Sequence, residues 1–244
     1  FKEVSKGTQG HYLLLRRRIL EYRPNLKVQD INLKFIEKFD TFLRNKSVIT
    51  DAGLFNRHKN LKSFIRFAIK EKLLEKNPYE DFKMPRCQEK FEYITKEEMD
   101  KIKNLDLSEQ KNIKGLGFTK DMFLFACCTG MRYSDVRNLK WSHIKSMQYI
   151  DGLYTQKTNA KLSMPLSRLA IKILMKYKRY KTENVFPFRT NACLNRDLKK
   201  IAEICKIEKN VTFHMSRHTY ATILANNNVN PFHISKLMTH SKIG

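Results

Sequence analysis

The feature that most restricts the fold of this chain is a long amphipathic repeat between residues 50 and 75. Apolar side chains recur there at the spacing of one helix face, namely Leu54, Leu61, Phe64, Ile65, Ala68, Ile69 and Leu73. Its other positions carry a row of basic side chains: Arg57, His58, Lys59, Lys62, Arg66 and Lys70. An apolar helix face packs against neighbouring elements. Because Asn77-Pro78 stops the pattern, the repeat predicts a long helix inside a larger domain.

Two shorter helical patterns precede this repeat and can supply its packing partners. Residues 8–23 are typical of a helix with Thr8 as its N-cap. Residues 30–43 place apolar side chains on one stripe and predict a second helix. We therefore expect residues 1–82 to form a helical domain, and residues 83–94, which show no clear periodicity, to form a linker.

A second domain is expected over residues 95–244, because Thr95 and Glu98 have the capping-box pattern that begins a helix. Strand patterns occupy residues 141–150, 153–156 and 161–166, and Asp151-Gly152 is a strong signal for a hairpin turn. The other patterned segments are helical and cover residues 95–104, 121–128, 134–139, 167–180, 192–205, 214–225 and 231–238. The predicted fold class is mainly α with a small antiparallel sheet (α+β).

The charge of the chain indicates a polyanionic partner. Lysine and arginine number 48 against 24 acidic residues, which gives a formal net charge of +24. Residues 1–88 carry 20 basic and 10 acidic residues and residues 89–244 carry the other 28 and 14, so both domains are basic. Two basic domains fit a protein that holds a polyanion from two sides. Candidate contacts to the phosphodiester backbone are Arg57, Lys59, Lys62 and Arg66, although a solvated helix face shows the same pattern.

Cysteine usage and hydropathy argue against several other classes of protein. The five cysteines are an odd number, include the vicinal pair Cys127-Cys128 and lack a Cys-x-x-Cys spacing, which argues against a disulfide framework and against zinc. No apolar run approaches the roughly 20 residues that cross a bilayer, and no signal peptide is visible. We therefore expect a cytoplasmic protein with reduced thiols and no membrane association.

Basic residues stand at several positions from which a fold can bring them together. Arg132 comes shortly after a glycine suited to end a helix, and Lys157 lies beside the predicted hairpin. His214 and Arg217 are three residues apart and share one helix face, while His240 follows a short helix. Each alone is weak, because a single Arg or His is more often a surface or packing residue. Together, guanidinium and imidazole groups in a basic protein predict a phosphate site.

In these segments the chain resembles the tyrosine recombinases, or phage integrase family. Thr129-Gly-Met-Arg132, with Asp135 three residues later, resembles the family's Thr-Gly-x-Arg box. His214-Met-Ser-Arg217-His-Thr resembles the His-x-x-Arg-His-Thr box, and Leu237-Met-Thr-His240-Ser resembles a box that usually reads Leu-Gly-His-Ser. Lys157 corresponds by context to the lysine of the family's mobile loop, which implies that it protonates the leaving 5′-oxygen.

The resemblance implies a chemistry for the other residues of these boxes. Arg132 and Arg217 would hold the non-bridging oxygens of a phosphodiester. His214 and His240 would donate to the same phosphate, and His214 would help to deprotonate the nucleophile. Asp135 would hold the segment of Arg132 in place without taking part in the chemistry. No cofactor is implied, and no metal is expected because no carboxylate cluster for Mg²⁺ is visible in the sequence.

The match is specific over residues 95–244 and extends to the first domain by pattern only, as a core-binding helical domain. Thr239 stands where the family usually has Gly. The family's nucleophilic tyrosine lies roughly two to three helical turns beyond the last His of these boxes, so we expect it in a C-terminal segment past Gly244. Tyr220 and Tyr133 are expected to be packing residues.

The resemblance predicts a site-specific DNA recombinase of the integrase type. It would cut and rejoin strands through a 3′-phosphotyrosine intermediate and so integrate or excise a mobile element, such as a phage or a conjugative element. The implied partner is double-stranded DNA with core-type sites. A monomer in solution would form a homo-tetramer on synapsed DNA, with accessory DNA-bending or directionality factors. Two alternatives stay open: a catalytically incomplete DNA-binding fragment or regulator, and an enzyme like a type IB topoisomerase.

Overall fold

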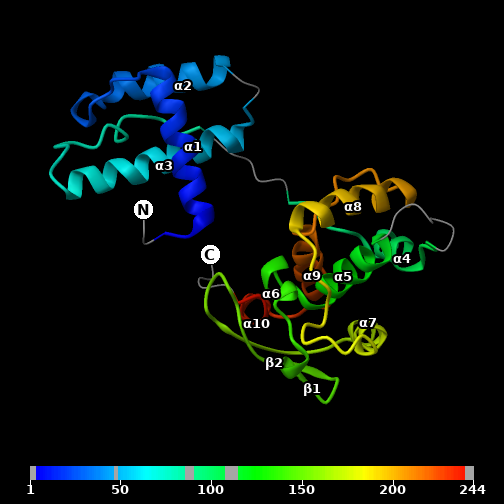
Figure 1. The fold of residues 1–244 in the computed structure, drawn as a ribbon. Helices are drawn as coiled ribbons and strands as arrows, with labels where there is room; N and C mark the ends of the chain where they lie inside the picture. Colours follow the sequence, from blue (N-terminus) through cyan, green and yellow to red (C-terminus); the bar gives the residue numbers. More distant parts are fainter. Residues whose placement is uncertain (1–3, 47–48, 86–90, 108–114, 240–244) are drawn as a thin grey trace. The chain divides into compact units, whose positions relative to one another are not determined.

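The structure is a computed structural model that describes residues 4–46, 49–85, 91–107 and 115–239 of the 244-residue chain. The chain divides into two compact units, residues 1–90 and residues 91–244 (Figure 1). Each unit has a hydrophobic core of its own. Within the described residues, no helix is both long and apolar enough to cross a membrane.

The first unit is built from helices that enclose an aromatic core. These are α1 (Lys6–Tyr22), α2 (Leu33–Lys46) and α3 (Asp51–Lys70), with a short 3-10 turn, η1 (Val28–Asp30), before α2. α1 contacts both α2 and α3. Phe39, Leu61 and Ile65 are fully buried in the core. The helical character that the periodicity predicted for this region is therefore confirmed.

Two helix ends in this unit differ from the predicted ones. α1 begins at Lys6 because Ser5, and not Thr8, provides the cap: the Ser5 side chain accepts from the N–H of Thr8 over 3.3 Å. α3 ends at Lys70, five residues before the expected Glu75. The N–H of Leu73 donates to the carbonyl of Ala68 over 2.8 Å, which is the bond of a Schellman-type helix end.

His58 does not belong to the basic face of α3, as the sequence pattern suggested. Its side chain is fully buried, with Nδ1 2.9 Å from the hydroxyl of Tyr79 and Nε2 3.0 Å from Oδ1 of Asp40. Burial lowers the pKa of His58, against an opposing effect of Asp40. The prediction failed because helical spacing cannot distinguish a basic surface residue from a polar residue that has buried partners.

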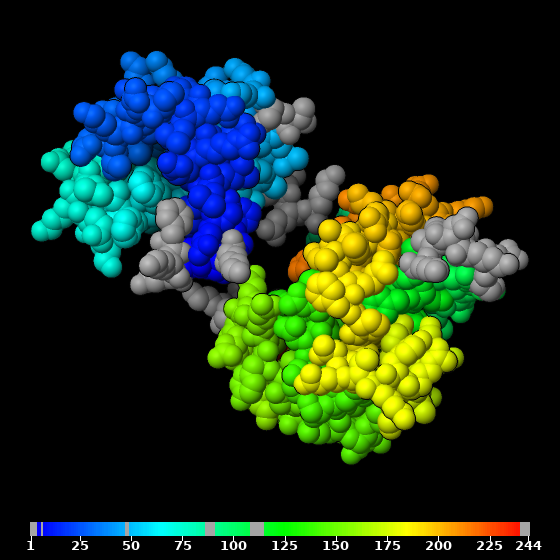
Figure 2. Space-filling view, in the orientation of Figure 1, coloured from blue at the N-terminus to red at the C-terminus, as the bar shows by residue number. Residues whose placement is uncertain are grey.

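The second unit surrounds the buried helix α5 (Leu116–Thr129), in which Phe123 and Phe125 are fully buried. The helices that contact α5 are α4 (Lys96–Asn104), α6 (Tyr133–Arg137), α7 (Arg168–Lys178), α8 (Asn191–Ile204) and α9 (Met215–Asn226). The last helix described, α10 (Pro231–Leu237), packs on α9. Atoms of α7, of α8 and of the segment between them form much of the face of this unit seen in Figure 2, in yellow to orange.

The predicted boundaries of α4 and α5 hold at two points and differ at one. The capping box is confirmed, since the N–H of Thr95 donates to Glu98 Oε2 over 2.8 Å and the N–H of Glu98 donates back to Thr95 Oγ1 over 3.3 Å. Gly130 ends α5 with a left-handed φ of 63°, also as predicted. α5 begins at Leu116, earlier than the expected Asp121, because Leu116 is itself buried and extends the packed face by a turn.

The unit also contains a small antiparallel sheet in the order β1-β2-β3, as the predicted fold class required. Its strands are β1 (Ile144–Lys145), which follows the 3-10 turn η2 (Trp141–His143), β2 (Tyr149–Tyr154) and β3 (Lys161–Pro165). β3 also contacts α10. Figure 1 shows the β2–β3 hairpin rising beside α6 and α10.

The prediction of a hairpin turn at Asp151-Gly152 is wrong. The pair lies inside β2, where the pairing with β3 shifts between Asp151 and Leu153 as in a β-bulge, and Gly152 has a φ of 83°. The bulge has a packing reason. Ile150 and Leu153 are three residues apart and both buried, which the alternating sides of a regular strand would not allow. The turn between β1 and β2 lies instead at Ser146-Met147, whose φ values are 50° and 54°.

Candidate phosphate-binding site

Arg132 is placed by the end of α5. Gly130 terminates that helix, and Arg132 occupies the N-cap position of α6 two residues later. A Cβ added to Gly130 would lie 2.3 Å from a ring carbon of Tyr220, so the glycine also permits α9 to pack closely against this turn. The local fold thus fixes the backbone from which the Arg132 side chain extends.

Arg217 enters the site from α9 and is only 5% exposed. Its Nη1 donates to the carbonyl of Gly130 over 2.7 Å, and its Nη2 donates to the carbonyl of Met238, just after α10. Burial and the nearby charge of Arg132 lower the pKa of Arg217 to about 10, although Asp135 acts in the opposite direction. The guanidinium therefore stays charged at neutral pH in a poorly hydrated position, where it interacts strongly with an anion.

His214 stands at the N-cap position of α9, with part of its surface open to solvent. Its ring lies edge-on to the ring of His218, with the centroids 5.0 Å apart. Partial burial lowers the pKa of His214, and His218, Arg217, Arg132 and Lys157 lower it further. The imidazole is therefore neutral at pH 7 and sits among the cations that were predicted to join it.

The end of α10 brings the two arginines together. Arg132 Nη1 donates to the hydroxyl oxygen of Thr239 over 3.1 Å, while Arg217 binds the carbonyl of the preceding residue, Met238. His240, the other residue predicted from this segment, lies outside the described residues. In the sequence Thr239 is only a departure from a family pattern, and its contact with Arg132 was not predicted.

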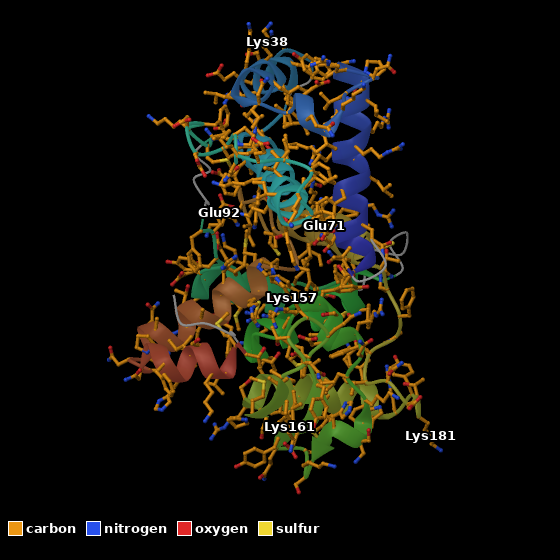
Figure 3. The ribbon with its side chains drawn as sticks, turned by 90° about the vertical axis from the view of Figure 1, so that its left-hand side faces the viewer. Lys38, Glu71, Glu92, Lys157, Lys161 and Lys181 are labelled. Carbon is orange, nitrogen blue, oxygen red and sulfur yellow. The ribbon has the colours of Figure 1, made fainter. Side chains whose placement is uncertain are left out.

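Asp135 joins α6 to the β2–β3 hairpin. It is 2% exposed, and its Oδ1 accepts from the backbone N–H of Gln156 over 3.1 Å and from the hydroxyl of Ser134 over 3.2 Å. Lys157, labelled in Figure 3, follows Gln156 in the turn between β2 and β3, and its side chain is exposed. Asp135 therefore lies where it can hold both the start of α6, next to Arg132, and the turn that carries Lys157.

The tyrosines near the site have structural contacts. The hydroxyl of Tyr133 donates to the carbonyl of Arg189 over 2.7 Å. Tyr220 is 8% exposed, and burial, together with Cys128, raises its pKa to about 12. A buried phenol of this kind is a poor nucleophile at neutral pH.

The basic residues predicted on α3 do not share one environment. The side chains of Lys59 and Arg66 are exposed. Lys62 is half-buried, with its Nζ 5.8 Å from the centroid of the Tyr79 ring. Arg57 is also half-buried, and burial and the charge of Arg18 lower its pKa. Lys59 and Arg66 are thus the members of this set that present their charge most openly.

Over the part of the chain that the structure describes, no group of three or more His, Cys, Asp or Glu side chains is arranged to hold a metal ion. Cys127, Cys128, Cys193 and Cys205 are free thiols. The described site gathers cations and an imidazole, and its carboxylate, Asp135, is buried against backbone groups, so the composition suits an anionic ligand.

Two protein-family models match the chain. The model described as the phage integrase family matches residues 92–244, and the phage integrase SAM-like domain matches residues 2–84. Among curated proteins, tyrosine recombinase XerC of Pediococcus pentosaceus is 26% identical over 233 residues, covering 88% of this chain and 74% of that protein. A tyrosine recombinase of Thermosipho africanus is 24% identical over 250 residues, covering 98% and 86%.

Solved structures share the fold. A lambda integrase dimer bound to a COC′ core site matches with a TM-score of 0.79 at 19% identity, covering 99% of this chain and 90% of that chain. The Tn1549 transposon integrase in complex with circular intermediate DNA matches with a TM-score of 0.77 at 18% identity, covering 99% and 88%. The likeness extends over both units of the chain.

Proposed function

Because this chain belongs to the phage integrase family of tyrosine recombinases, which cleave and rejoin DNA, we propose that it is a site-specific integrase that acts through a 3′-phosphotyrosine intermediate. The observation that carries this proposal is the meeting of Arg132 and Arg217 at the end of α10, with His214 beside them. Like charges held this close repel one another, and an anion bound between them relieves the repulsion.

The anion is the phosphate at which a DNA strand is cut. Attack on a phosphodiester builds negative charge on the non-bridging oxygens, and planar guanidinium groups bind such oxygens with directed hydrogen bonds. Arg217 is held rigidly by two backbone carbonyls, so little reorganisation is needed when the charge develops. Arg132 binds the phosphate from the other side, and His240 is proposed as a further donor to it.

Two groups are suited to move protons in the proposed reaction. His214 is neutral at pH 7 and can take the proton of an attacking tyrosine hydroxyl. Lys157 can give a proton to the 5′-oxygen as it leaves. Because Asp135 binds the backbone next to Lys157, it is proposed as the residue that keeps this turn near the phosphate.

The reaction balances without a cofactor. The tyrosine oxygen forms a bond to phosphorus, the bond from phosphorus to the 5′-oxygen breaks, and a 3′-phosphotyrosine and a free 5′-hydroxyl result. A 5′-hydroxyl of a second strand then reverses these steps on the new partner. The phosphotyrosine conserves the energy of the phosphodiester, so no nucleotide hydrolysis is required.

We assign DNA contacts to both parts of the chain: residues 1–82 as the core-binding domain, with Arg57, Lys59, Lys62 and Arg66, residues 83–94 as a linker, and residues 95–244 as the catalytic domain. The net charge of +24 supports binding to duplex DNA. A solved lambda integrase is a tetramer bound to a Holliday junction, which supports a homo-tetramer on synapsed DNA for this chain also. Integration and excision of a mobile element in the cytoplasm, aided by directionality factors, is the proposed role.

A suicide substrate tests the proposal. The full natural protein is incubated with duplex DNA that carries a nick near the cleavage point, so that the short released strand diffuses away and the covalent complex accumulates. We expect a complex that survives denaturation, and peptide mapping then identifies the tyrosine that carries the DNA. Arg217→Ala should abolish trapping, whereas Arg196→Ala, which removes the same charge from an exposed position on α8, should retain it.

The outcomes separate the proposed function from its alternatives. Tight DNA binding without any covalent complex would indicate a DNA-binding regulator. Relaxation of supercoiled plasmids that needs no second recombination site, with no exchanged products, would indicate an enzyme like a type IB topoisomerase. Full trapping by Arg217→Ala would refute the role given to Arg217.

A further inference from the structure

Thr239 has an uncommon backbone conformation directly after α10. Its φ is 51°, in the left-handed region that β-branched residues rarely adopt. Its own N–H donates to the carbonyl of Lys236 over 3.0 Å and so closes the end of the helix. Glycine would take this conformation without strain but has no side chain to offer. A residue held in such a conformation inside a functional site raises the question of what its side chain does there.

The side chain of Thr239 contacts one of the two arginines that the site depends on. Arg132 Nη1 donates to its hydroxyl oxygen over 3.1 Å. A hydroxyl accepts this hydrogen bond without cancelling the charge of the guanidinium, whereas a carboxylate in the same place would form an ion pair and compete with the DNA phosphate. The contact therefore orients Arg132 and leaves its charge and its other N–H groups for the phosphate.

Orientation matters more for Arg132 than for Arg217. Arg217 is fixed by two backbone carbonyls, those of Gly130 and Met238. Arg132 is held by a side-chain hydroxyl, and it is repelled by Arg217, whose pKa its charge helps to lower. Without that hydroxyl, repulsion and rotamer freedom would both move Arg132 away from the phosphate position.

We propose that Thr239 is a positioning residue for Arg132, which its hydroxyl holds in the binding geometry before DNA arrives. The proposal rests on the proposed function and deepens it, because it makes the identity of residue 239 a determinant of the cleavage rate. Ordering the guanidinium in the free protein lowers the reorganisation that the transition state requires. The effect should therefore appear in the rate of cleavage and hardly at all in the affinity for duplex DNA.

Three substitutions separate the hydroxyl from the backbone strain. Thr239→Val keeps the β-branched shape and the strain but lacks the oxygen. Thr239→Ser keeps the oxygen but lacks the branching methyl group. Thr239→Gly removes both. Thr222→Val, on α9 and outside the site, makes the same chemical change as the first variant and serves as the matched control.

The first readout is single-turnover cleavage of the nicked substrate by the full natural protein, with DNA affinity measured in parallel. We expect Thr239→Val and Thr239→Gly to cleave about tenfold more slowly, the loss typical of one hydrogen bond in a reaction site. Thr239→Ser and Thr222→Val should cleave at the wild-type rate. All four variants should bind duplex DNA as the wild type does. In an Arg132→Lys background, Thr239→Val should not slow cleavage any further.

The second readout needs no DNA. In protein labelled with ¹⁵N-arginine, the guanidinium resonance of Arg132 is assigned by its loss in Arg132→Lys. In the wild type and in Thr239→Ser it should report a side chain with restricted motion and slow hydrogen exchange. In Thr239→Val it should report a mobile side chain. An unchanged Arg132 resonance in Thr239→Val, or cleavage by that variant at the wild-type rate, would overturn the proposal. If the wild type cleaves no DNA, the proposed function fails, but the resonance still decides whether Thr239 positions Arg132.

Discussion

The guanidinium of Arg217 donates to the carbonyl oxygen of Gly130 over 2.7 Å, which ties α9 to the residue that ends α5. The carbonyl points toward Arg217 because the backbone of Gly130 is in the left-handed conformation, with a φ of 63°. The ring of Tyr220 packs against the same glycine, where a Cβ would lie 2.3 Å from a ring carbon. The position of Arg217 therefore depends on the absence of a side chain at residue 130.

Gly130→Ala should both destabilise the protein and disable the site. The left-handed backbone costs alanine about 1 kcal/mol, and the clash with Tyr220 adds roughly 1–3 kcal/mol. Gly152→Ala is the matched control, because Gly152 also has a positive φ, of 83°, but nothing lies within 4 Å of its added Cβ. Chemical denaturation of the two variants should show the larger loss of unfolding free energy for Gly130→Ala. Equal losses would contradict the close packing of Tyr220.

The hydrogen bond from Gln156 to Asp135 predicts that Asp135 acts through the hairpin. Asp135→Ala leaves the backbone N–H of Gln156 without this acceptor and frees the turn that carries Lys157, so cleavage should slow by at least about tenfold. A DNA substrate with sulfur in place of the leaving 5′-oxygen tests the reason, because a thiolate leaves without being protonated. This substrate should restore cleavage by Lys157→Ala and, in large part, by Asp135→Ala.

The same sulfur substrate should not rescue Arg217→Ala, which lacks a phosphate ligand and not a proton donor. If Asp135→Ala stays slow on the sulfur substrate, Asp135 acts mainly on the Arg132 side of α6. Asp135→Asn, which keeps an oxygen acceptor for the N–H of Gln156, should retain more activity than Asp135→Ala on the normal substrate.

The pKa of His214 predicts the acid limb of the pH–rate profile. Partial burial and the surrounding cations lower this pKa, so the neutral ring, which is the form that accepts a proton, persists below the usual histidine pKa of about 6.5. The single-turnover rate should hold down to about pH 6.5 and fall only below it. Lys157→Ala removes one of these cations and should move the acid limb to higher pH on the sulfur substrate. An acid limb at the same pH in Lys157→Ala and in the wild type would show that the charge of Lys157 does not lower the pKa of His214.

The sequence and the structure agree where a residue type has one physical reason to be in its place. The capping box at Thr95 and the left-handed Gly130 are examples, since each follows from the backbone groups at a helix end. Asp151-Gly152 also has a strong local preference, but the need to bury both Ile150 and Leu153 outweighs it, and the pair forms a bulge. A tertiary requirement of this kind is not visible in a local pattern.

In the candidate site, too, local relationships are visible in the sequence and tertiary contacts are not. Spacing within α9 relates His214 to Arg217, but nothing in the sequence reveals that Arg217 reaches the carbonyls of Gly130 and Met238. Those contacts depend on how α5, α9 and α10 pack. The hydrogen bond from Arg132 to Thr239 joins residues 107 positions apart, so it was equally hidden. The basic residues and Asp135 could be listed from the sequence, whereas the carbonyls and the Thr239 hydroxyl that orient the two arginines required the fold.

His58 in the first unit predicts a pH-dependent stability that is separate from catalysis. Its pKa is lowered by burial between Asp40 and Tyr79, so the unfolded chain binds a proton at a higher pH than the folded chain does. The contribution of His58 to the free energy of unfolding is then complete above the unfolded pKa of about 6.5 and is lost as the pH falls from there through the folded pKa. His143 and His214 shift in the same direction, so only a comparison with a variant isolates His58. His58→Gln keeps a polar side chain but cannot titrate, and its thermal unfolding midpoint, followed by circular dichroism, should fall less between pH 7.5 and pH 5.5 than that of the wild type. An equal fall of the midpoint in both proteins would mean that folding does not lower the pKa of His58.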